Sequence, residues 1–538
     1  MSTSTAVEAQ PDSKTRRYDR QLRLWAASGQ SALENSRLLV ISASATSTSI
    51  LKNLVLPGVG HFTILDPATV TPRDAGNNFF LEGESSIGKS RAQEAVRLLA
   101  ELNDGVEGKA DTSSLEHILD TNPAYFASYT LVIAHNLEPK LLERLSTLLW
   151  ADDTLPTLVV VNSAGFLGEF YIQFHEHTII DSHSETAPSL RIDKAFPALY
   201  DYSTSLDFAS MDPTDHTHVP YVVILVRALA DWKAAHDGKP PQTAADKKAF
   251  KEAIRGMQVK SDEENFEEAE AQAYRCWTET GVPSDIAALF QDPQLSTLSP
   301  TSPPFFHLLE ALRRFTLEPP HTLPLTSTLP DMKANTASYI HLQKLYKTRA
   351  EEEKAILKGF LSVPVDDVLV DSFVKNAHGL KVLRGKKYGT LNADSAALAS
   401  NVASSSKAAA IHLALSALAA VGPQPTIETL TVAAQALLPP GTELPEDFSD
   451  AVGEMCVPFV LCFSSVSPMP RVSSPNADAV SPRFAHCSAR SPTADLPNTA
   501  AFLGGLVAQE VIKMITKQYV PISSYCVVDL VETWTGTI

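Results

Sequence analysis

Cysteines are few in this chain and do not form recognisable pairs. The 538 residues include five, with no CxxC pair and no regular spacing: Cys276, Cys456, Cys462, Cys487 and Cys526. Small secreted folds and structural zinc sites use closely spaced cysteines, so this pattern argues against both a disulfide framework and a zinc site. We therefore expect reduced thiols in an intracellular protein.

Long apolar runs and an excess of positive charge are also missing. No uninterrupted apolar stretch approaches the roughly 20 residues needed to cross a bilayer, and the polar start, MSTSTAVEAQPDSKTRRYDR, lacks the apolar stretch of a secretory signal. Lysine and arginine total 44 against 62 aspartates and glutamates, a net charge of −18 that would repel nucleic acid and anionic membranes. We expect a cytoplasmic or nuclear protein whose partners are proteins, with no nucleic acid and no membrane among them.

Strand and helix patterns alternate in the first part of the chain. Residues 16–30 carry Tyr18, Leu22 and Trp25 at helical spacing, which predicts a helix that ends near Gly29. Short apolar runs then alternate with helical patterns, as is typical of a Rossmann-like, doubly wound and mostly parallel α/β sheet. The predicted strands cover 37–42, 61–66, 130–134 and 157–162, and the predicted helices cover 46–56, 88–103 and 138–150.

The chain is too long for one ordinary domain, so we divide it into several parts. A flexible arm (1–15) precedes the first part of the sheet domain (16–169), and a large helix-rich insert (170–455) follows. A Ser- and Pro-rich segment (456–490) is interpreted either as a mobile loop or as unspliced sequence in the gene model. The last part (491–538) should return to the sheet domain through a helix at 498–517, with Val507, Val511, Ile512 and Ile515 inward, and a strand at 524–530.

Several motifs occur in an order and spacing that resemble a known family. They include YDRQLRLWAASGQSALENSRLLVI, LKNLVLPGVGHFTILD, DAGNNFFL, SSIGKSRAQEAVRLLAELN, VPYVVILVRALADW, LPDMKANTASYIHLQKLY and AAFLGGLVAQEVIKMITKQYVPI. Together they resemble the activating enzymes for ubiquitin-like modifiers, with their ThiF-like adenylation domain. Within that family the chain is most similar to the regulatory subunits of heterodimeric neddylation enzymes. The resemblance implies an adenylation-type sheet domain whose helical insert corresponds to the domain that holds the catalytic cysteine in active members.

The phosphate-binding turn of active members is altered in this sequence. Phosphates normally lie against a Gly-rich turn at a helix N-terminus, where backbone N–H groups approach the anion closely. Here the turn reads SASATS, and alignment on Lys52 and Asn53 places Ser42, Ala45 and Ser47 at the expected glycines. Because the added side chains would obstruct that approach, we expect no competent phosphate site.

Other positions that touch the nucleotide in active members are also changed. Asp66 ends the second predicted strand and is either a ribose ligand, as its family counterpart is, or a carboxylate that opens a turn. Asn77 and Asn78 stand where the resemblance implies an Arg–Gln pair, and a neutral amide cannot replace a guanidinium beside phosphate. Lys89 is retained, although a lone lysine at a helix start is more often a surface residue.

The metal ligand and the nucleophile of active members have no counterparts that we recognise. His135 stands at the position implied for a magnesium-binding aspartate, and imidazole is a poor ligand for that hard cation. Cys276, in YRCWTE, lies in a helical pattern, and we interpret it as a core thiol rather than a nucleophile. The chain is therefore expected to bind neither cofactor nor metal, with ATP and magnesium held by its partner.

Two features point to roles in an assembly. Arg20 occupies the arginine position of the YDRQ-type motif, which by resemblance reaches the partner's ATP in trans; the alternative is a surface salt bridge. The acidic run at 261–270 (SDEENFEEAE) is most simply a solvated helix face, and its functional alternative is electrostatic steering of a basic partner.

Together, the residues and the resemblance predict that the chain is a non-catalytic pseudoenzyme subunit. It would support its partner's ATP site and the binding of the modifier. Expected partners are the catalytic subunit, the ubiquitin-like modifier of neddylation and the cognate conjugating enzyme. The alternatives are a regulatory subunit for another modifier and a self-sufficient adenylyltransferase. A nicotinamide-dependent oxidoreductase is disfavoured because the GxGxxG motif is missing.

Overall fold

The computed structural model describes residues 12–185, 187–260, 262–422, 425–455 and 495–538. The chain forms two compact units: one takes residues up to His177 and from Leu383 onward, and the other takes Thr178–Val382. The whole Ser- and Pro-rich segment predicted at 456–490, with Cys456, Cys462 and Cys487, lies outside the described residues, as do residues 1–11 of the predicted arm. Residues 13–15 of that arm belong to a helix, α1 (Ser13–Arg17).

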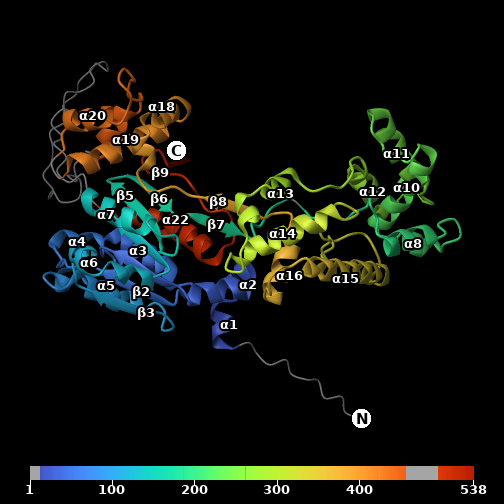
Figure 1. Cartoon of the computed structure of the whole chain (residues 1–538), viewed down its shortest axis with the longest axis horizontal. Helices are drawn as coiled ribbons and strands as arrows, with labels where there is room; N and C mark the ends of the chain where they lie inside the picture. The colour runs from blue at the N-terminus through green and yellow to red at the C-terminus, as the bar shows by residue number, and fades with distance from the viewer. Residues whose placement is uncertain (1–11, 186, 261, 423–424, 456–494) are drawn as a thin grey trace, which may run out of the picture. The chain divides into compact units, whose positions relative to one another are not determined.

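An eight-stranded sheet organises the first unit, in the order β10-β9-β6-β5-β4-β1-β2-β3. Figure 1 labels β2, β3, β5, β6 and β9 of this sheet. Five neighbouring strands are parallel, and β6, β9 and β10 complete the sheet in antiparallel fashion. The mostly parallel α/β fold predicted from the sequence is therefore confirmed. The strands are β1 (Arg37–Ile41), β2 (His61–Leu65), β3 (Glu107–Asp111), β4 (Leu131–His135), β5 (Thr157–Ala164), β6 (Leu167–Gln173), β9 (Cys526–Asp529) and β10 (Trp534–Thr537).

Alternation along the strands separates the residues of the two sheet faces. Leu38 and Val40 of β1 belong to one buried cluster, whereas Leu39 and Ile41 belong to another, because successive side chains of a strand point to opposite faces. The first face is covered by α3 (Ala45–Val55), α5 (Arg91–Ala100) and α22 (Pro497–Thr516), and the second by α6 (Leu115–Thr121) and α7 (Pro139–Trp150). Both faces of the parallel strands β1, β2, β4 and β5 are therefore largely buried, whereas the edge strand β3 is half-exposed.

Helix α22 returns the chain to the core after an interval of more than 300 residues from β6. Val507 and Val511 are fully buried as expected from the sequence, whereas Ile512 and Ile515 are only partly buried. Gly504 permits close packing on α3, since a Cβ there would lie 2.7 Å from the side chain of Ser49. Among the described residues α22 alone is long and apolar enough to cross a bilayer, yet it packs into the core of this unit.

The helices after residue 390 pack on the antiparallel end of the same sheet. Leu167 of β6 and Val527 of β9 share a buried cluster with Leu398, Ile411 and Leu430. The sequence-based division placed these helices in one insert spanning 170–455, but the contacts place the boundaries at His177 and Leu383. These helices are α17 (Thr390–Ala393), α18 (Ser395–Ser404), α19 (Ser406–Val421), α20 (Ile427–Gln435) and α21 (Phe448–Met455).

The N-terminal helix differs from its prediction. Helix α2 (Asp19–Glu34) does not end at Gly29 but is broken at Trp25 and Ala26, whose backbone angles are not helical. Gly29 lies inside the second half of the helix, where a Cβ would come within 2.8 Å of the Trp25 side chain. A glycine in that position therefore reflects close packing against the indole rather than a helix terminus.

The second unit is mainly helical in its described part. Its largest clusters form around Leu225 and Phe306, and between them Arg191 and Glu353 form a buried bidentate ion pair with N–O distances of 2.7 and 2.6 Å. The helices are α8 (Pro197–Ser205), α9 (Pro213–His216), α10 (Tyr221–Ala235), α11 (Ala244–Gly256), α12 (Glu264–Ala271), α13 (Ser284–Leu289), α14 (Pro304–Leu317), α15 (Thr336–Gly359) and α16 (Asp367–Lys375). A separate two-stranded sheet pairs β7 (Glu176–Ile179) with β8 (Lys381–Arg384).

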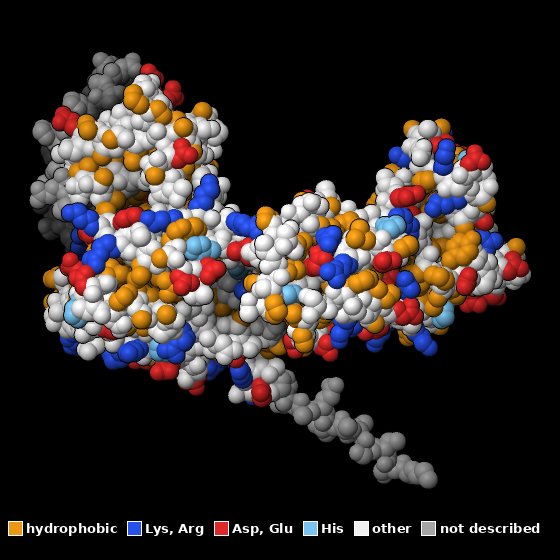
Figure 2. Space-filling view, viewed as in Figure 1, with side chains coloured by type: hydrophobic (Ala, Val, Ile, Leu, Met, Phe, Trp, Pro, Cys, Tyr) orange, Lys and Arg blue, Asp and Glu red, His pale blue; other side chains and the backbone are white. Residues whose placement is uncertain are grey.

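The acidic run at 261–270 is not a simple solvated face. Glu263 is fully buried and lies 2.9 Å from Nδ1 of His216, and Asn265 and Phe266 are buried beside it. Glu264 and Glu270 form ion pairs with Lys333 and Arg255. Figure 2 shows basic and acidic side chains intermixed over the face in view. The run is therefore solvent-exposed at Asp262, Glu264 and Glu267, as expected for a solvated helix face. The interpretation made from the sequence is corrected at Glu263, which is buried.

Candidate functional site

The candidate crevice lies where β1 and β4 end side by side. The chain builds β1, β2 and β3 in one direction and then returns to place β4 on the other side of β1. Ligands of doubly wound sheets bind at this type of switch point, outside the carboxyl ends of the strands. Here it brings the turn after β1 next to His135 of β4, whose Nδ1 lies 2.8 Å from the Ser44 hydroxyl.

The turn from β1 to α3 keeps a backbone shape that suits glycine, although its residues are not glycines. Ser42 has a φ of 80°, in the left-handed region that L-residues seldom adopt. Ser44 is the N-cap of α3, and its hydroxyl accepts a hydrogen bond from the backbone N–H of Ser47 at 3.1 Å. Ala45 and Ser47, at the other two altered positions, are buried in the first turn.

A carboxylate from the far end of the chain occupies the N-terminus of α3. Asp495, just before α22, accepts hydrogen bonds from the backbone N–H of Thr46 at 3.0 Å and from its hydroxyl at 2.5 Å. A helix N-terminus favours an anion because its N–H groups are unpaired and its dipole end is positive. The chain thus places an internal anion at the helix end where a phosphate binds in nucleotide-binding turns.

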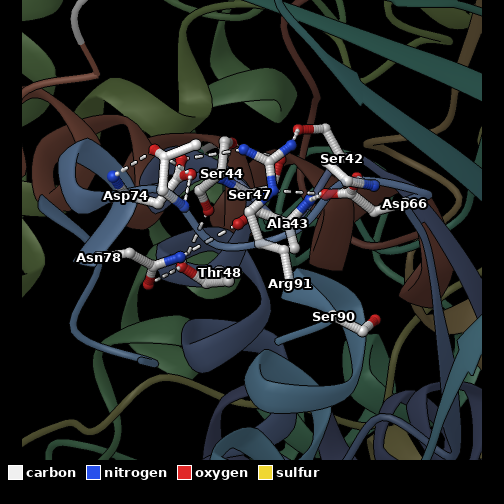
Figure 3. A network of polar contacts seen from close by, with 12 residues as sticks. Ser42, Ala43, Ser44, Ser47, Thr48, Asp66, Asp74, Asn78, Ser90 and Arg91 are labelled. Atoms are coloured by element: carbon white, nitrogen blue, oxygen red, sulfur yellow. Dashed lines mark hydrogen bonds and ion pairs between the residues drawn. The ribbon is translucent and has the colours of Figure 1, made fainter. Parts of the chain in front are cut away.

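A second carboxylate is fixed inside the crevice by Arg91. Asp66 is buried and accepts hydrogen bonds from the backbone N–H groups of Ala43 and Ala68 at 2.7 and 2.9 Å. Arg91, the first residue of α5, donates to Asp66 through Nε at 2.7 Å and to Asp74 through a terminal nitrogen at 3.0 Å (Figure 3). The Asp66 carboxylate therefore binds groups of its own chain. It opens a turn, which was one of the two interpretations made from the sequence.

The charges of this cluster are strongly interdependent. Burial lowers the pKa of Arg91, but the hydrogen bonds and charges of Asp66 and Asp74 outweigh it and raise that pKa overall. Burial raises the pKa of Asp74, but hydrogen bonds from Thr71 and the charge of Arg91 lower it overall. Both groups are charged at neutral pH, so Arg91 is committed to carboxylates of its own chain.

Asn77, Asn78 and Lys89 lie in different surroundings. Asn78 is buried; its amide donates to the carbonyl of Ala43 at 3.1 Å and accepts from the Thr48 hydroxyl at 2.9 Å. Asn77 is half-buried at the end of α4 (Pro72–Asn77). Lys89 is exposed, with its ammonium 3.7 Å from Glu94. Of the three, only Asn78 is joined to the crevice, and there it holds the turn in place.

His135 is built into a row of hydroxyl groups. Its Nδ1 lies 2.8 Å from Ser44 Oγ and its Nε2 lies 2.9 Å from Ser163 Oγ. Burial lowers the pKa of His135, and although the charge of Asp495 raises it, the net shift is downward. The His135 imidazole is thus neutral at physiological pH. Among the described residues, no group of three or more His, Cys, Asp or Glu side chains is arranged to hold a metal ion.

The two described cysteines are buried thiols. Cys276 lies in the core of the second unit, where burial raises its pKa to about 12. Cys526 lies in β9, where burial raises its pKa to about 11. A thiol of such high pKa carries almost no thiolate at neutral pH, so neither residue is suited to nucleophilic attack.

Arg20 lies on the exposed surface of α2. No hydrogen bond or ion pair of its side chain occurs within the described residues, whereas Arg17 pairs with Asp104 and Arg23 with Asp19. The surface salt bridge considered as the alternative from the sequence is therefore absent from the part of the chain that the structure describes. Arg20 thus has an exposed guanidinium that no described residue pairs with.

Comparison with known proteins places this fold in a family. Residues 18–136 match the model of the ThiF family. A protein named NEDD8-activating enzyme E1 regulatory subunit from Xenopus laevis is 34% identical over 533 residues, covering 94% of this chain and 95% of its own. The protein of the same name from Gallus gallus is 35% identical over 535 residues, with coverages of 94% and 95%. This chain belongs to the NEDD8-activating enzyme E1 regulatory subunit family.

Plant and bacterial proteins extend the comparison. The NEDD8-activating enzyme E1 regulatory subunit AXR1 of Arabidopsis thaliana is 32% identical and covers 96% of this chain and 95% of its own. A solved E. coli tRNA N6-threonylcarbamoyladenosine dehydratase, in complex with AMP, is 13% identical with a TM-score of 0.26, covering 32% of this chain and 67% of its own. The NEDD8-activating enzyme relatives, at 32–35% identity over almost their whole length, confirm the family resemblance inferred from the sequence motifs.

Several residues of the crevice in this family member were not singled out from the sequence. Arg91, Asp74 and Asp495 hold or fill the site, and Ser44 and Ser163 flank His135. Ser44 and Asp74 carried local signals, since a serine before a helical pattern is a typical N-cap and Asp74 completes a capping box with Thr71. Asp495 gave none, because its partner Thr46 is distant in sequence.

Proposed function

We propose that this chain is the regulatory, non-catalytic subunit of a heterodimer that activates NEDD8, and that a catalytic subunit supplies the ATP site and the reactive cysteine. The observation that carries the proposal is the self-filled crevice: Asp66 and Asp495 accept the backbone N–H groups of Ala43 and Thr46. Those N–H groups belong to the turn and helix start that would otherwise face a phosphate. The residues present therefore do not fit ATP and magnesium.

Electrostatics supports the same conclusion. Two carboxylates in a partly buried crevice repel the phosphates of ATP, and the nearest guanidinium, Arg91, is shared between Asp66 and Asp74. The neutral His135 occupies the strand end where a carboxylate would have to hold magnesium. Three separate features would have to change before a nucleotide fitted.

Arg20 is the group that we propose acts on the partner's nucleotide. It is exposed and unpaired within the described residues, so its guanidinium is available for phosphate oxygens, which its planar fork matches. NEDD8 and its cognate conjugating enzyme are the proposed further partners, and the cytoplasm and nucleus the proposed locations.

The test is ATP–pyrophosphate exchange with NEDD8, measured with this chain alone and together with its catalytic partner. We expect no exchange from the chain alone and exchange from the pair. Arg20→Ala in the pair should slow exchange at least tenfold, because arginines of this type stabilise transferred phosphate charge. Arg23→Ala is the matched control, since Arg23 lies on the same helix and is paired with Asp19. Exchange by the chain alone would instead identify a self-sufficient adenylyltransferase.

A further inference from the structure

The helix that carries Arg20 is interrupted five residues later. Trp25 has φ −124° and ψ 16°, and Ala26 has φ 57° and ψ −177°. The angles of Ala26 lie in a region that is essentially restricted to glycine. A residue other than glycine keeps this backbone conformation only when neighbouring residues stabilise it. The contacts around the break therefore show which residues stabilise it.

Buried aromatic side chains fix both ends of the short segment that contains Arg20. Tyr18 is buried, and its hydroxyl accepts a hydrogen bond from the Asn103 amide at 2.9 Å. Trp25 is also buried, and its indole N–H donates to Gln30 at 3.3 Å. Arg20 is therefore an exposed residue on a short helical stretch between two anchored rings, and the break lies at the end of that stretch.

At the break, a side chain from another part of the chain donates a hydrogen bond to the backbone carbonyl of Trp25. In a continuous helix the carbonyl of Trp25 would accept from the N–H of Gly29. Here it accepts from the side-chain amide of Gln518 at 2.9 Å. Gln518 is buried, and it follows the C-cap of α22, Lys517, which is left-handed with a φ of 54°. The end of α22 therefore carries the residue that secures the break in α2.

We propose that Gln518 is a positioning residue for Arg20. By holding the carbonyl of Trp25 away from the helical path, it fixes the angle between the two halves of α2 and so the direction in which Arg20 leaves the surface. This proposal rests on the proposed function, in which Arg20 meets the nucleotide of the catalytic subunit. Gln518 touches no nucleotide itself and acts only through α2.

The experiment uses the complete heterodimer, with exchange rates measured for Gln518→Leu, Arg20→Ala and the double variant. Leucine keeps the volume of glutamine but cannot donate a hydrogen bond. We expect Gln518→Leu to lower kcat between about tenfold and a hundredfold, as for a misplaced catalytic group, with the affinity between the subunits unchanged. The double variant should be no slower than Arg20→Ala, because both changes remove the same interaction. Gln509→Leu, at an exposed position of α22, is the matched control and should leave the rate unchanged.

Two results would overturn the assignment of Gln518. A normal rate for Gln518→Leu would show that the amide does not orient Arg20, and a loss that multiplies with that of Arg20→Ala would show a separate structural effect. If Arg20→Ala itself is silent, the trans role in the proposed function fails, and the role of Gln518 falls with it. A slow Arg20→Ala variant beside a normal Gln518→Leu variant overturns the positioning proposal alone.

Discussion

Replacing Arg91 with methionine should destabilise the first unit far more than the same change at Arg97 on the same helix. The Arg91 side chain is 18% exposed and that of Asp66 only 3%, so the variant leaves a buried carboxylate without its counter-charge. Removing one partner of a buried pair costs about 3–5 kcal/mol. Asp66 keeps two backbone N–H donors, which reduces our expectation to roughly 2–4 kcal/mol. Arg97 is 43% exposed; its partner Glu82 is also exposed, and its buried partner Glu94 keeps contacts with Lys89 and Ser86, so the loss of Arg97 should cost about 1 kcal/mol or less.

Urea denaturation of the full chain measures the difference. With an m-value of about 3 kcal/mol per molar, the first transition of Arg91→Met should move down by roughly 1 M, while that of Arg97→Met should barely move. Adding Asp66→Asn to Arg91→Met should recover part of the loss, because the second change removes the unpaired buried charge. Equal midpoints for the two arginine variants would refute the reasoning and would mean that Asp66 does not need Arg91.

Three further predictions concern other parts of the chain. Cys276 and Cys526 should resist alkylation at pH 7.5 in the native chain, as read by peptide mass spectrometry, because burial raises their pKa values to about 12 and about 11; rapid labelling of either would contradict this. Burial lowers the pKa of His177 to about 4, so between pH 6.5 and pH 4 the unfolded chain binds a proton at His177 that the folded chain does not. The free energy of unfolding should therefore fall by about 3 kcal/mol as the pH drops from 6.5 to 4. His177→Gln should flatten that fall, and an unchanged pH profile would exclude His177 as its cause. Glu263→Gln should lower the urea midpoint of the second unit through its buried contact with His216, whereas Glu267→Gln, at an exposed position, should not; the reverse order would restore the solvated-face interpretation.

Periodicity made much of the sheet predictable from the sequence. The segments that form β1, β2, β4 and β5 are mostly apolar because both faces of those strands are covered. This pattern can be recognised from the sequence without any knowledge of the fold. Edge strand β3 was missed because its sequence, EGKAD, is polar and only half-buried, so it carries no apolar signal. Its place in the sheet depends on pairing with β2.

In the candidate site, too, some features could be predicted from the sequence and others could not. The side chains at Ser42, Ala45 and Ser47 are visible in the sequence once the motif is aligned, and so is the imidazole at His135. What fills the turn is not visible, since Thr46 and Asp495 are separated by 449 positions along the chain. The same holds for the break in α2, where the pattern predicted an end at Gly29 and the structure shows Gln518 holding Trp25.

By itself, the sequence determined the strand and helix periods, the family and the loss of the glycine turn, because these are properties of neighbouring residues. Only the tertiary structure decided which carboxylates occupy the crevice, which residues hold α2 in its broken form, and that the helices after residue 390 belong with the first unit. The physical reason is that hydrogen bonds and ion pairs act over a few ångströms in space. Their partners can lie hundreds of residues apart, where no local pattern records them.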